Sequence, residues 1–277
     1  MNNKDIKEHI SQIFTRAAST YDQVGFRFFS YFGNRLVELT RIPQNAKVLD
    51  VATGRGASLF PAIKRVGFEG TVVGIDIAEG MVKETEMEIK NKGISNVKVV
   101  QMDAENLTYQ DNTFDFVLCG LSIFFFPHYT HALREALRVL KPGGQIGIST
   151  FFHKSHDELK WLGPLFQKYI SSMKEEKKLE KDTKEPEFDT VEGMQKILIA
   201  AGFKDFHHEI EEKEFVCQNA EEFWEFLWSI YTRNTLERIP SSRLVELKEE
   251  IKRNFIEHSQ DNVLYITVRV LFTFGRK

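Results

Sequence analysis

The sequence predicts an α/β fold in which a mainly parallel sheet carries helices on both faces. Short runs rich in β-branched residues recur at 47–52, 71–76, 97–102, 114–119 and 145–150. The segments between these runs space their apolar residues as amphipathic helices do, and this alternation is typical of parallel sheets. The first run ends in a glycine-rich turn that opens a helix. A ligand site is therefore expected at the carboxyl edge of the sheet.

The elements outside these five runs follow from apolar spacing and turn residues. Residues 1–45 are expected to be helical, because apolar side chains recur three and four residues apart at Ile10, Ile13, Phe14 and Ala17. The turn Lys-Pro-Gly-Gly at 141–144 is expected to deliver the chain into the fifth strand. Residues 172–188 are polar with mixed charge and predict a solvated helix or loop. A helix is expected at about 241–257 and a long strand at 264–274.

Two further helices have start and stop signals. Asp189 with Glu192 resembles a capping box, and Gly202 is the expected stop of the helix that follows. Asn219 with Glu222 forms a second such start, directly before a run of aromatic and apolar residues. Both helices lie in the part of the chain that follows the five predicted strands.

The composition is that of a globular protein of 277 residues, with 42% hydrophobic and 28% charged residues. A formal net charge of −3 gives no electrostatic reason to expect a nucleic-acid partner. The longest apolar run, 116–126, is far shorter than the roughly 20 residues of a membrane span. The charged N-terminus lacks the apolar core of a signal peptide, and the two distant cysteines, Cys119 and Cys217, indicate a reducing compartment. We expect a cytoplasmic protein without stable membrane insertion.

The glycine-rich turn suits a polar or anionic ligand. Gly54 and Gly56 have no Cβ, so a ligand can approach the backbone, and the following helix N-terminus offers unpaired N–H groups. Asp76 closes the second strand 20 residues after Gly56, where a carboxylate can accept hydrogen bonds from two ribose hydroxyls. Together these features indicate a cofactor that contains a nucleoside.

Three features distinguish among such cofactors. The third glycine of the dinucleotide pattern GxGxxG is missing. Asp50, inside the first strand, would disfavour a pyrophosphate but suits an ammonium group. Asp103, after the third strand, suits the exocyclic amine of a base. S-adenosylmethionine (SAM) has an amino-acid end, a ribose and an adenine, and so fits all three. A nicotinamide (NAD) oxidoreductase on a related fold is disfavoured by Asp50 and the missing glycine.

The same stretches resemble the motifs of the class I SAM-dependent methyltransferases. VLDVATGRG (48–56), VVGIDIAEGMV (72–82) and QMDAENL (101–107) match the first three motifs of that family. FDFVLCGLSIFF (114–125) and LRVLKPGG (137–144) match the later motifs around the fourth and fifth strands. The resemblance implies a Rossmann-like sheet of seven strands in the order 3-2-1-4-5-7-6, with the last strand antiparallel.

Within that family, the stretch ASTYD and the turn DVATGRG are most similar to the ubiquinone/menaquinone C-methyltransferase group and related natural-product enzymes. Ala52 stands where many members have the first glycine of the turn, and a small residue still permits the turn. Tyr21 is a candidate for the tyrosine that closes over SAM in many members, with simple packing as the alternative. The residues implied to bind SAM, or its product S-adenosylhomocysteine (SAH), are Tyr21, Asp50, Ala52, Thr53, Gly54, Gly56, Asp76, Ile77, Met81, Asp103, Ala104, Gly120 and Leu121.

The acceptor site is expected above the carboxyl ends of the fourth and fifth strands. Because the chain has 24 phenylalanines, an apolar or aromatic pocket is the economical account. The candidate lining residues are Phe26, Phe29, Phe124, Phe125, Phe152, Trp224 and Trp228. His153 and His156 are candidate bases if the acceptor must lose a proton. No cluster of histidine, cysteine and carboxylate residues predicts a metal site.

The resemblance implies a SAM-dependent methyltransferase that acts on a lipophilic aromatic or terpenoid-type small molecule, at carbon, oxygen or nitrogen. A quinone-biosynthesis C-methyltransferase is one alternative. A non-catalytic SAM-binding protein is another, because methyl transfer requires no diagnostic catalytic residue. Residues 1–45 are expected to form a helical lid on a SAM-binding domain at 46–277, which carries cap inserts at about 155–188 and 219–258. A monomer or a homodimer is expected.

Overall fold

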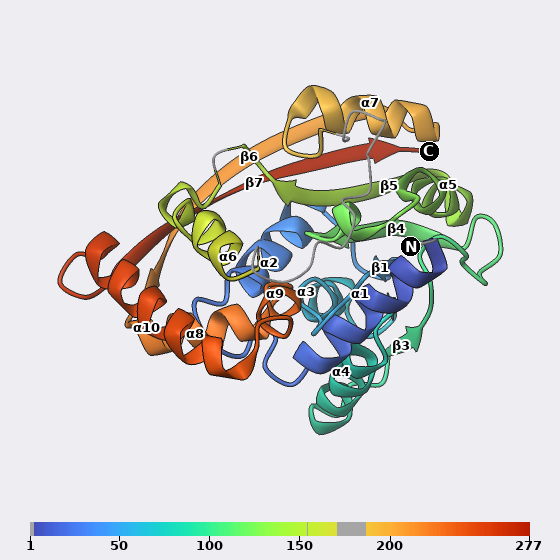
Figure 1. Cartoon of the computed structure of the whole chain (residues 1–277). Coiled ribbons are helices and arrows are strands. Elements are labelled where there is room, and N and C mark those ends of the chain that lie inside the picture. Colours follow the sequence, from blue (N-terminus) through green and yellow to red (C-terminus); the bar gives the residue numbers. More distant parts are fainter. Residues whose placement is uncertain (1–2, 154, 171–186) are drawn as a thin grey trace.

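The computed structural model describes residues 3–153, 155–170 and 187–277 (Figure 1). Its centre is a seven-stranded sheet in the order β3-β2-β1-β4-β5-β7-β6, which confirms the predicted topology. The first five strands are parallel, and β7 runs antiparallel to both of its neighbours. The strands are β1 (Lys47–Val51), β2 (Thr71–Asp76), β3 (Val97–Gln101), β4 (Phe114–Gly120), β5 (Leu140–Phe151), β6 (Lys204–Cys217) and β7 (Leu264–Arg276).

Helices cover both faces of the sheet (Figure 1). One buried core joins α2 and α3 to the sheet, and another joins α5 and α7 to the opposite face. Val48 lies in the first core and Leu49 in the second, because successive residues of a strand point to opposite faces. The helices are α1 (Asn3–Ala17), α2 (Phe28–Thr40), α3 (Leu59–Val66), α4 (Glu79–Asn91), α5 (Tyr129–Val139), α6 (Leu162–Ile170), α7 (Val191–Ala201), α8 (Ala220–Ser229), α9 (Arg233–Leu236) and α10 (Ser241–His258), with 3-10 turns η1 (Ile123–Phe125) and η2 (Asp157–Leu159).

The last two strands carry a group of helices at one end of the sheet. β6 and β7 are 14 and 13 residues long, and α6, α8 and α10 gather at their far end (Figure 1). We call α6, α8, α9 and α10 the C-terminal cap. The rings of Phe223 in α8 and Phe255 in α10 lie 5.9 Å apart, and Ile266 of β7 is buried in the same core. The C-terminal cap therefore shares a continuous core with the sheet.

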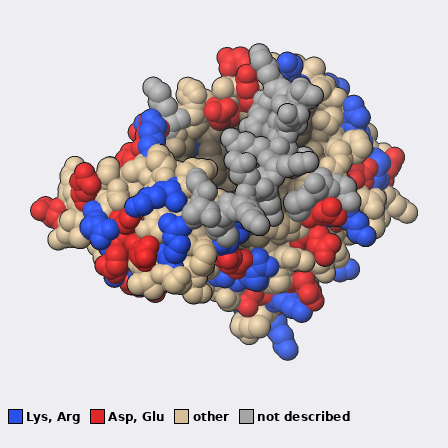
Figure 2. All heavy atoms as spheres, in the orientation of Figure 1, with Lys and Arg blue, Asp and Glu red and all other residues tan. Residues whose placement is uncertain are grey.

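The helical region expected at 1–45 consists of two helices, α1 and α2, joined by a loop at 18–27. The turn at 141–144 lies inside the bounds of β5, where the pairing with β4 is irregular. Most of the polar stretch 172–188 lies outside the described residues. In the part of the chain that the structure describes, no helix combines the length and apolarity needed to cross a membrane. Basic and acidic side chains are interspersed on the face shown in Figure 2.

The helix boundaries follow capping chemistry, with one correction. Thr190, and not Asp189, caps the N-terminus of α7, because its extended backbone lets its hydroxyl accept the N–H of Gly193 at 3.1 Å. Gly202 ends α7 in the left-handed conformation, with φ of 104°, as predicted. Asn219 caps α8, also as predicted.

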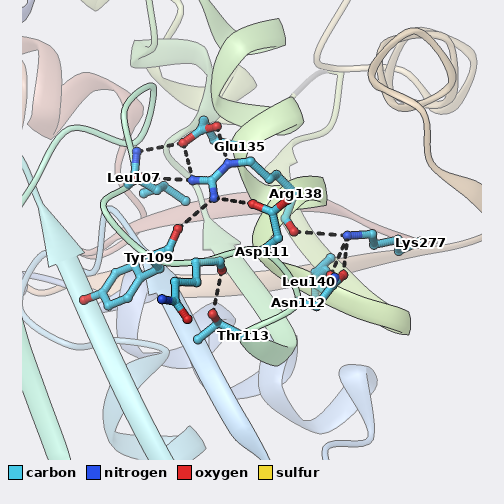
Figure 3. Close-up of polar contacts among 10 residues, drawn as sticks. Leu107, Tyr109, Asp111, Asn112, Thr113, Glu135, Arg138, Leu140 and Lys277 are labelled. Carbon is cyan, nitrogen blue, oxygen red and sulfur yellow. Dashed lines mark hydrogen bonds and ion pairs between the residues drawn. The ribbon is translucent and has the colours of Figure 1, made fainter.

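Arg138 of α5 fixes the loop that leads from β3 to β4 (Figure 3). Its guanidinium donates to the backbone oxygens of Leu107 and Tyr109 at 2.9 and 2.7 Å. It also bonds to the carboxylates of Glu135 and Asp111, and Glu135 in turn accepts the N–H of Leu107 at 2.9 Å. This network fixes the segment before β4 to the C-terminal end of α5, where the N–H of Thr113 also donates to the backbone oxygen of Val139 at 2.7 Å.

Candidate functional site

The glycine-rich turn after β1 depends on left-handed backbone conformations. Ala52, Gly54 and Gly56 have φ angles of 53°, 52° and 81°. A Cβ on Gly56 would lie 2.7 Å from the ring of Phe60, so this glycine is required by packing. A Cβ on Gly54 would meet only the ring of Tyr21, at 3.8 Å. Gly54 is therefore the point at which the turn opens toward a ligand.

Two buried carboxylates flank this turn. Asp50 of β1 accepts the hydroxyl of Thr53 at 2.5 Å, and Asp76 of β2 accepts the N–H groups of Gly54 and Ala78 at 2.9 and 2.8 Å. Burial raises the pKa of Asp50 to about 7 and that of Asp76 to about 6. A cation or a set of hydroxyl donors at this edge would stabilise both carboxylates in their ionised form.

Helix α1 closes over the end of β3 and the start of α4. Lys7 forms ion pairs with Asp103 and Glu105, at 2.7 and 2.5 Å. Further along the helix, the hydroxyl of Thr15 accepts the N–H of Gly80 at 3.2 Å. A Cβ on Gly80 would lie 2.5 Å from the backbone oxygen of Thr15, so α1 can pack this closely only on a glycine. The carboxylate of Asp103, implied to bind the base, is therefore bonded to a side chain of α1.

Three cavities meet at this edge. The acidic cavity encloses about 740 Å³ and is lined by Lys7, Ile10, Phe14, Tyr21, Ala52, Gly54, Asp76, Ile77, Met81, Met102, Asp103, Ala104, Glu105, Gly120, Leu121, Ser122, Phe125, Phe126 and Pro127. The turn cavity encloses about 460 Å³ and is lined by Tyr21, Asp22, Phe29, Gly33, Asp50, Ala52, Thr53, Gly54, Arg55, Ala57, Ser58, Gly120, Leu121 and Ser149. The apolar cavity encloses about 730 Å³ and is lined by Phe14, Tyr21, Phe28, Phe29, Leu121, Phe124, Phe125, Phe151, His156, Leu159, Leu162, Phe226, Leu227, Ile230, Tyr231 and Thr232.

Tyr21 and Leu121 line all three cavities. The ring of Tyr21 lies 4.8 Å from that of Phe29 and 5.9 Å from that of Phe14. Leu121 adopts a left-handed φ of 47°, and its N–H is held by the hydroxyl of Ser149 at 3.1 Å. A ligand that fills the acidic and turn cavities would therefore face the apolar cavity at these two side chains.

The apolar cavity has no Asp, Glu, Lys or Arg among its described lining residues. His156 contributes an imidazole next to the rings of Phe151 and Phe28, at 4.9 and 5.9 Å between centroids. Burial lowers the pKa of His156 to about 4, so its imidazole is neutral near pH 7. This neutral side chain can accept or donate a hydrogen bond but is a weak general base.

The residues implied to bind the cofactor gather at one site. All but one of the thirteen line the acidic or the turn cavity. The exception, Gly56, lies behind the turn and shapes it through a hydrogen bond from its N–H to the oxygen of Thr53, at 2.8 Å. Among the described residues, no group of three or more histidine, cysteine or carboxylate side chains is arranged to hold a metal ion.

The aromatic residues expected at the acceptor site divide into two sets. Phe29, Phe124 and Phe125 line the apolar cavity. The other four do not: Phe26 packs against Phe226 in the core with the two rings tilted, Phe152 points to the opposite face of the sheet, and Trp224 and Trp228 pack against each other outside the cavity.

The two candidate bases also separate. His156 lines the apolar cavity, whereas His153 is exposed and its ring lies beside that of Phe152. The two residues are close in sequence, but only one of them can reach an acceptor in that cavity.

Several lining residues have no counterpart in the sequence-based prediction. Lys7, Ile10 and Phe14 lie on one face of α1, and their spacing of three and four residues was the available signal. Asp22 and Arg55 line the turn cavity; they belong to the stretch ASTYD and to the turn DVATGRG, but the sequence analysis assigned neither of them to the site. The cap side chains Leu162, Leu227, Ile230, Tyr231 and Thr232 reach the apolar cavity only through tertiary packing.

Known proteins resemble this chain in sequence and fold. The model of the ubiE/COQ5 methyltransferase family matches residues 1–219. The nocamycin O-methyltransferase of Saccharothrix syringae is 30% identical across 95% of this chain and 97% of that protein. The aklanonic acid methyltransferase DauC of Streptomyces sp. (strain C5) is 38% identical over 150 residues, which cover 54% of this chain and 68% of that protein.

Two further similarities complete the comparison. The demethylmenaquinone methyltransferase of Staphylococcus carnosus (strain TM300) is 33% identical over 186 residues, covering 63% of this chain and 76% of that protein. The solved structure of the YcgJ protein from Bacillus subtilis has a TM-score of 0.57 at 18% identity and covers 89% of this chain and 98% of that one. The structural similarity shows a shared fold.

Proposed function

Because the chain belongs to the ubiE/COQ5 methyltransferase family and is a SAM-dependent methyltransferase that acts on a small molecule, we propose that the acidic and turn cavities hold SAM and that the apolar cavity holds the methyl acceptor. The observation that carries this proposal is the junction at Tyr21 and Leu121, which line all three cavities. It is the point where a bound sulfonium methyl group would meet an acceptor.

The residues of the two polar cavities fit the parts of SAM. Asp76 ends β2 and suits the ribose hydroxyls, and Asp103, which also lines the acidic cavity, suits the adenine amine. Asp50 in the turn cavity suits the α-ammonium group. The raised pKa values of Asp50 and Asp76 support this fit, because a bound cation and hydroxyl donors would stabilise carboxylates that burial alone penalises.

The apolar cavity supports a lipophilic aromatic or terpenoid-type acceptor. Its walls are mainly phenylalanine, tyrosine and aliphatic side chains. The nocamycin relative matches 95% of this chain, so its match extends through the C-terminal cap that lines the cavity. The demethylmenaquinone relative matches 63% of this chain. This difference favours a specialised natural-product acceptor, with a quinone-biosynthesis C-methyltransferase as the alternative.

The chain contributes to methyl transfer mainly by positioning. SAM, when bound, supplies an electrophilic methyl group on a sulfonium. The aromatic walls of the apolar cavity exclude water and hold the acceptor against the junction, within the roughly 3–3.5 Å that displacement needs. Leu121 is held at the junction by the hydrogen bond that its backbone N–H donates to the hydroxyl of Ser149. His156 can orient a hydroxyl of the acceptor without carrying charge.

Calorimetric titration of the purified protein with SAM and with SAH tests the proposal. We expect both to bind with micromolar affinity, and lipophilic ring compounds can then be screened for turnover. Binding of NAD but not SAM in a thermal-shift assay would contradict the assignment of the cavities. Tight SAM binding without turnover of any such acceptor would instead favour a non-catalytic SAM-binding protein.

SAM affinity is expected to fall by about 100-fold from pH 7.5 to pH 5.5. Because the pKa of Asp50 is about 7 and that of Asp76 about 6, both carboxylates take up protons over this range and must release them to receive SAM. Calorimetry in two buffers of different ionisation enthalpy would measure both the affinity and the released protons. The Asp50→Asn variant should bind more weakly and show a flatter profile. A wild-type affinity independent of pH, with no proton release, would contradict the ionised-carboxylate account.

His156 and His153 provide a matched pair for the role of a base. The His156→Asn variant is expected to lose about 3- to 10-fold in kcat/KM with a hydroxylated acceptor, because one hydrogen bond in the apolar cavity is removed. The His153→Asn variant should retain wild-type kcat/KM, since His153 is exposed outside that cavity. Steady-state kinetics of the two variants measures the difference. Equal losses in both, or a loss in His153→Asn alone, would rule out the assignment of His156 to the acceptor.

A further inference from the structure

Two polar atoms of residues that line the turn cavity have no hydrogen-bond partner among the described residues. They are Oδ1 of Asp22 and Nε of Arg55, and both are shielded from solvent. Asp22 is only 6% exposed, and the side chain of Arg55 is 11% exposed. Buried polar atoms are almost always hydrogen-bonded in native proteins. One unpaired acceptor and one unpaired donor at the same cavity therefore point to a ligand that can satisfy both.

The rest of each side chain is already fixed by the fold. The other oxygen of Asp22 accepts the N–H of Ser30 at 3.0 Å and also the hydroxyl of Ser30, in the first turn of α2. A terminal nitrogen of Arg55 donates to the backbone oxygen of Ala18 at 2.7 Å. Each side chain is thus held in place by one of its groups. One further polar atom of each has no hydrogen-bond partner among the described residues.

The charged groups near these two atoms also have partners within the fold. The guanidinium of Arg55 lies 3.6 Å from carboxylate oxygens of Glu84 and of Glu88, both on α4. Burial raises the pKa of Asp22, while the Ser30 hydroxyl and Arg27 oppose that rise. Arg27 itself donates to the backbone oxygen of Asp22 and not to its carboxylate. A cationic ligand group next to Asp22 would compensate the negative charge of its carboxylate in the turn cavity.

We propose that Asp22 and Arg55 recognise the zwitterionic amino-acid end of SAM, with Asp22 accepting a hydrogen bond from the α-ammonium group and Arg55 donating one to the α-carboxylate. The inference rests on the proposed function, which places that end of SAM in the turn cavity. An α-ammonium group has three N–H donors, more than Asp50 alone satisfies. Opposite charges on the two residues also fix the direction in which the amino acid lies.

Asp22 also links the turn cavity to the apolar cavity through α2. Asp22 follows Tyr21, which lines all three cavities, and it holds Ser30 at the start of α2. The same helix carries Phe28 and Phe29 into the apolar cavity. Binding of the ammonium group therefore connects the cofactor to one wall of the acceptor cavity through a single carboxylate.

The Asp22→Asn variant tests the ammonium contact by comparing two ligands. SAH carries the amino acid, whereas 5′-methylthioadenosine keeps the nucleoside and lacks it. We expect the variant to bind SAH about 10- to 100-fold more weakly than wild type, as for a lost charge-assisted hydrogen bond, and to bind 5′-methylthioadenosine with unchanged affinity. Asp261→Asn is the matched control, because Asp261 is exposed and has a similar φ of 51°.

The outcomes separate this inference from the proposed function. Wild-type protein that binds SAH while Asp22→Asn binds it equally well would overturn the assignment of Asp22 alone. Equal weakening of SAH and 5′-methylthioadenosine would show a purely structural role and overturn it as well. Wild-type protein that binds neither ligand would overturn both proposals.

Decarboxylated SAM provides the corresponding test of Arg55. This ligand keeps the ammonium group and lacks the carboxylate. The Arg55→Met variant is expected to bind SAM about 10-fold or more weakly than wild type, with the affinity for decarboxylated SAM unchanged. Calorimetry measures both affinities. Equal loss for the two ligands, or no loss for SAM, would overturn the assignment of Arg55 to the carboxylate.

Discussion

Replacing Asp76 with alanine is expected to weaken SAM binding by about 1.5–3 kcal/mol, the range for hydrogen bonds to a charged group. Asp76 lines the acidic cavity at the end of β2, and its carboxylate already accepts the N–H groups of Gly54 and Ala78. The variant therefore loses the acceptor of the ribose hydroxyls and also the group that holds the glycine turn against β2. Calorimetric titration with SAM measures the loss.

Two further variants serve as comparisons for Asp76→Ala. Asp76→Asn keeps the shape of the side chain and one acceptor oxygen, so its affinity should lie between those of wild type and Asp76→Ala. Asp261→Ala removes an exposed carboxylate that lines none of the three cavities and should bind SAM as wild type does. Thermal melts without ligand show whether each variant is folded. A folded Asp76→Ala protein with wild-type affinity would mean that the ribose does not lie at Asp76.

Removal of the Tyr21 ring is expected to reduce kcat/KM by about 10- to 100-fold, because the ring lines all three cavities at their junction and a displaced acceptor reacts slowly. The ring packs between those of Phe14 and Phe29 and faces Gly54. Tyr21→Ala removes all of these contacts. Tyr21→Phe keeps them, and is expected to stay within about 3-fold of the wild-type kcat/KM if ring packing is the main contribution. Steady-state kinetics with an identified acceptor measures both variants.

Two outcomes for the Tyr21→Phe and Tyr21→Ala variants would contradict this prediction. If Tyr21→Phe lost as much activity as Tyr21→Ala, the phenolic hydroxyl and not the ring would be the important group. Activity of Tyr21→Ala at the wild-type level would show that Tyr21 does not shape the junction. SAH affinity of both variants, measured in parallel, separates an effect on the cofactor from an effect on the acceptor.

The fold was predictable because its signals are local. Buried parallel strands are short apolar runs, and the turns and caps between them use glycine, proline and asparagine at positions that the backbone conformation demands. Strand order came from the resemblance to a known family and not from the runs themselves. The N-cap of α7 was missed by one residue, since Asp189 and Thr190 are both good capping residues and only the backbone conformation selects Thr190.

The lining of the apolar cavity was less predictable, because the direction in which a side chain points depends on strand register and on helix packing. Phe151 ends β5 and Phe152 follows it directly, yet the first lines the apolar cavity and the second packs on the opposite face of the sheet. On α8, the buried ring of Phe226 lines the cavity, whereas Trp224 on the same helix does not. Residue type and spacing show that these side chains are aromatic but not which of them the fold turns inward.

The sequence by itself determined the class of protein and the carboxylates of the candidate cofactor site. Asp50, Asp76 and Asp103 lie within or just beyond strands whose carboxyl ends meet at one edge of a parallel sheet, so their convergence follows from local pattern and fold class. Only the tertiary structure decided what surrounds them. It brings Lys7 to Asp103 across 96 residues of chain, and it leaves one atom each of Asp22 and Arg55 at the turn cavity without a partner among the residues that the structure describes. Such contacts arise when separate helices pack, and no local pattern encodes the distance between them.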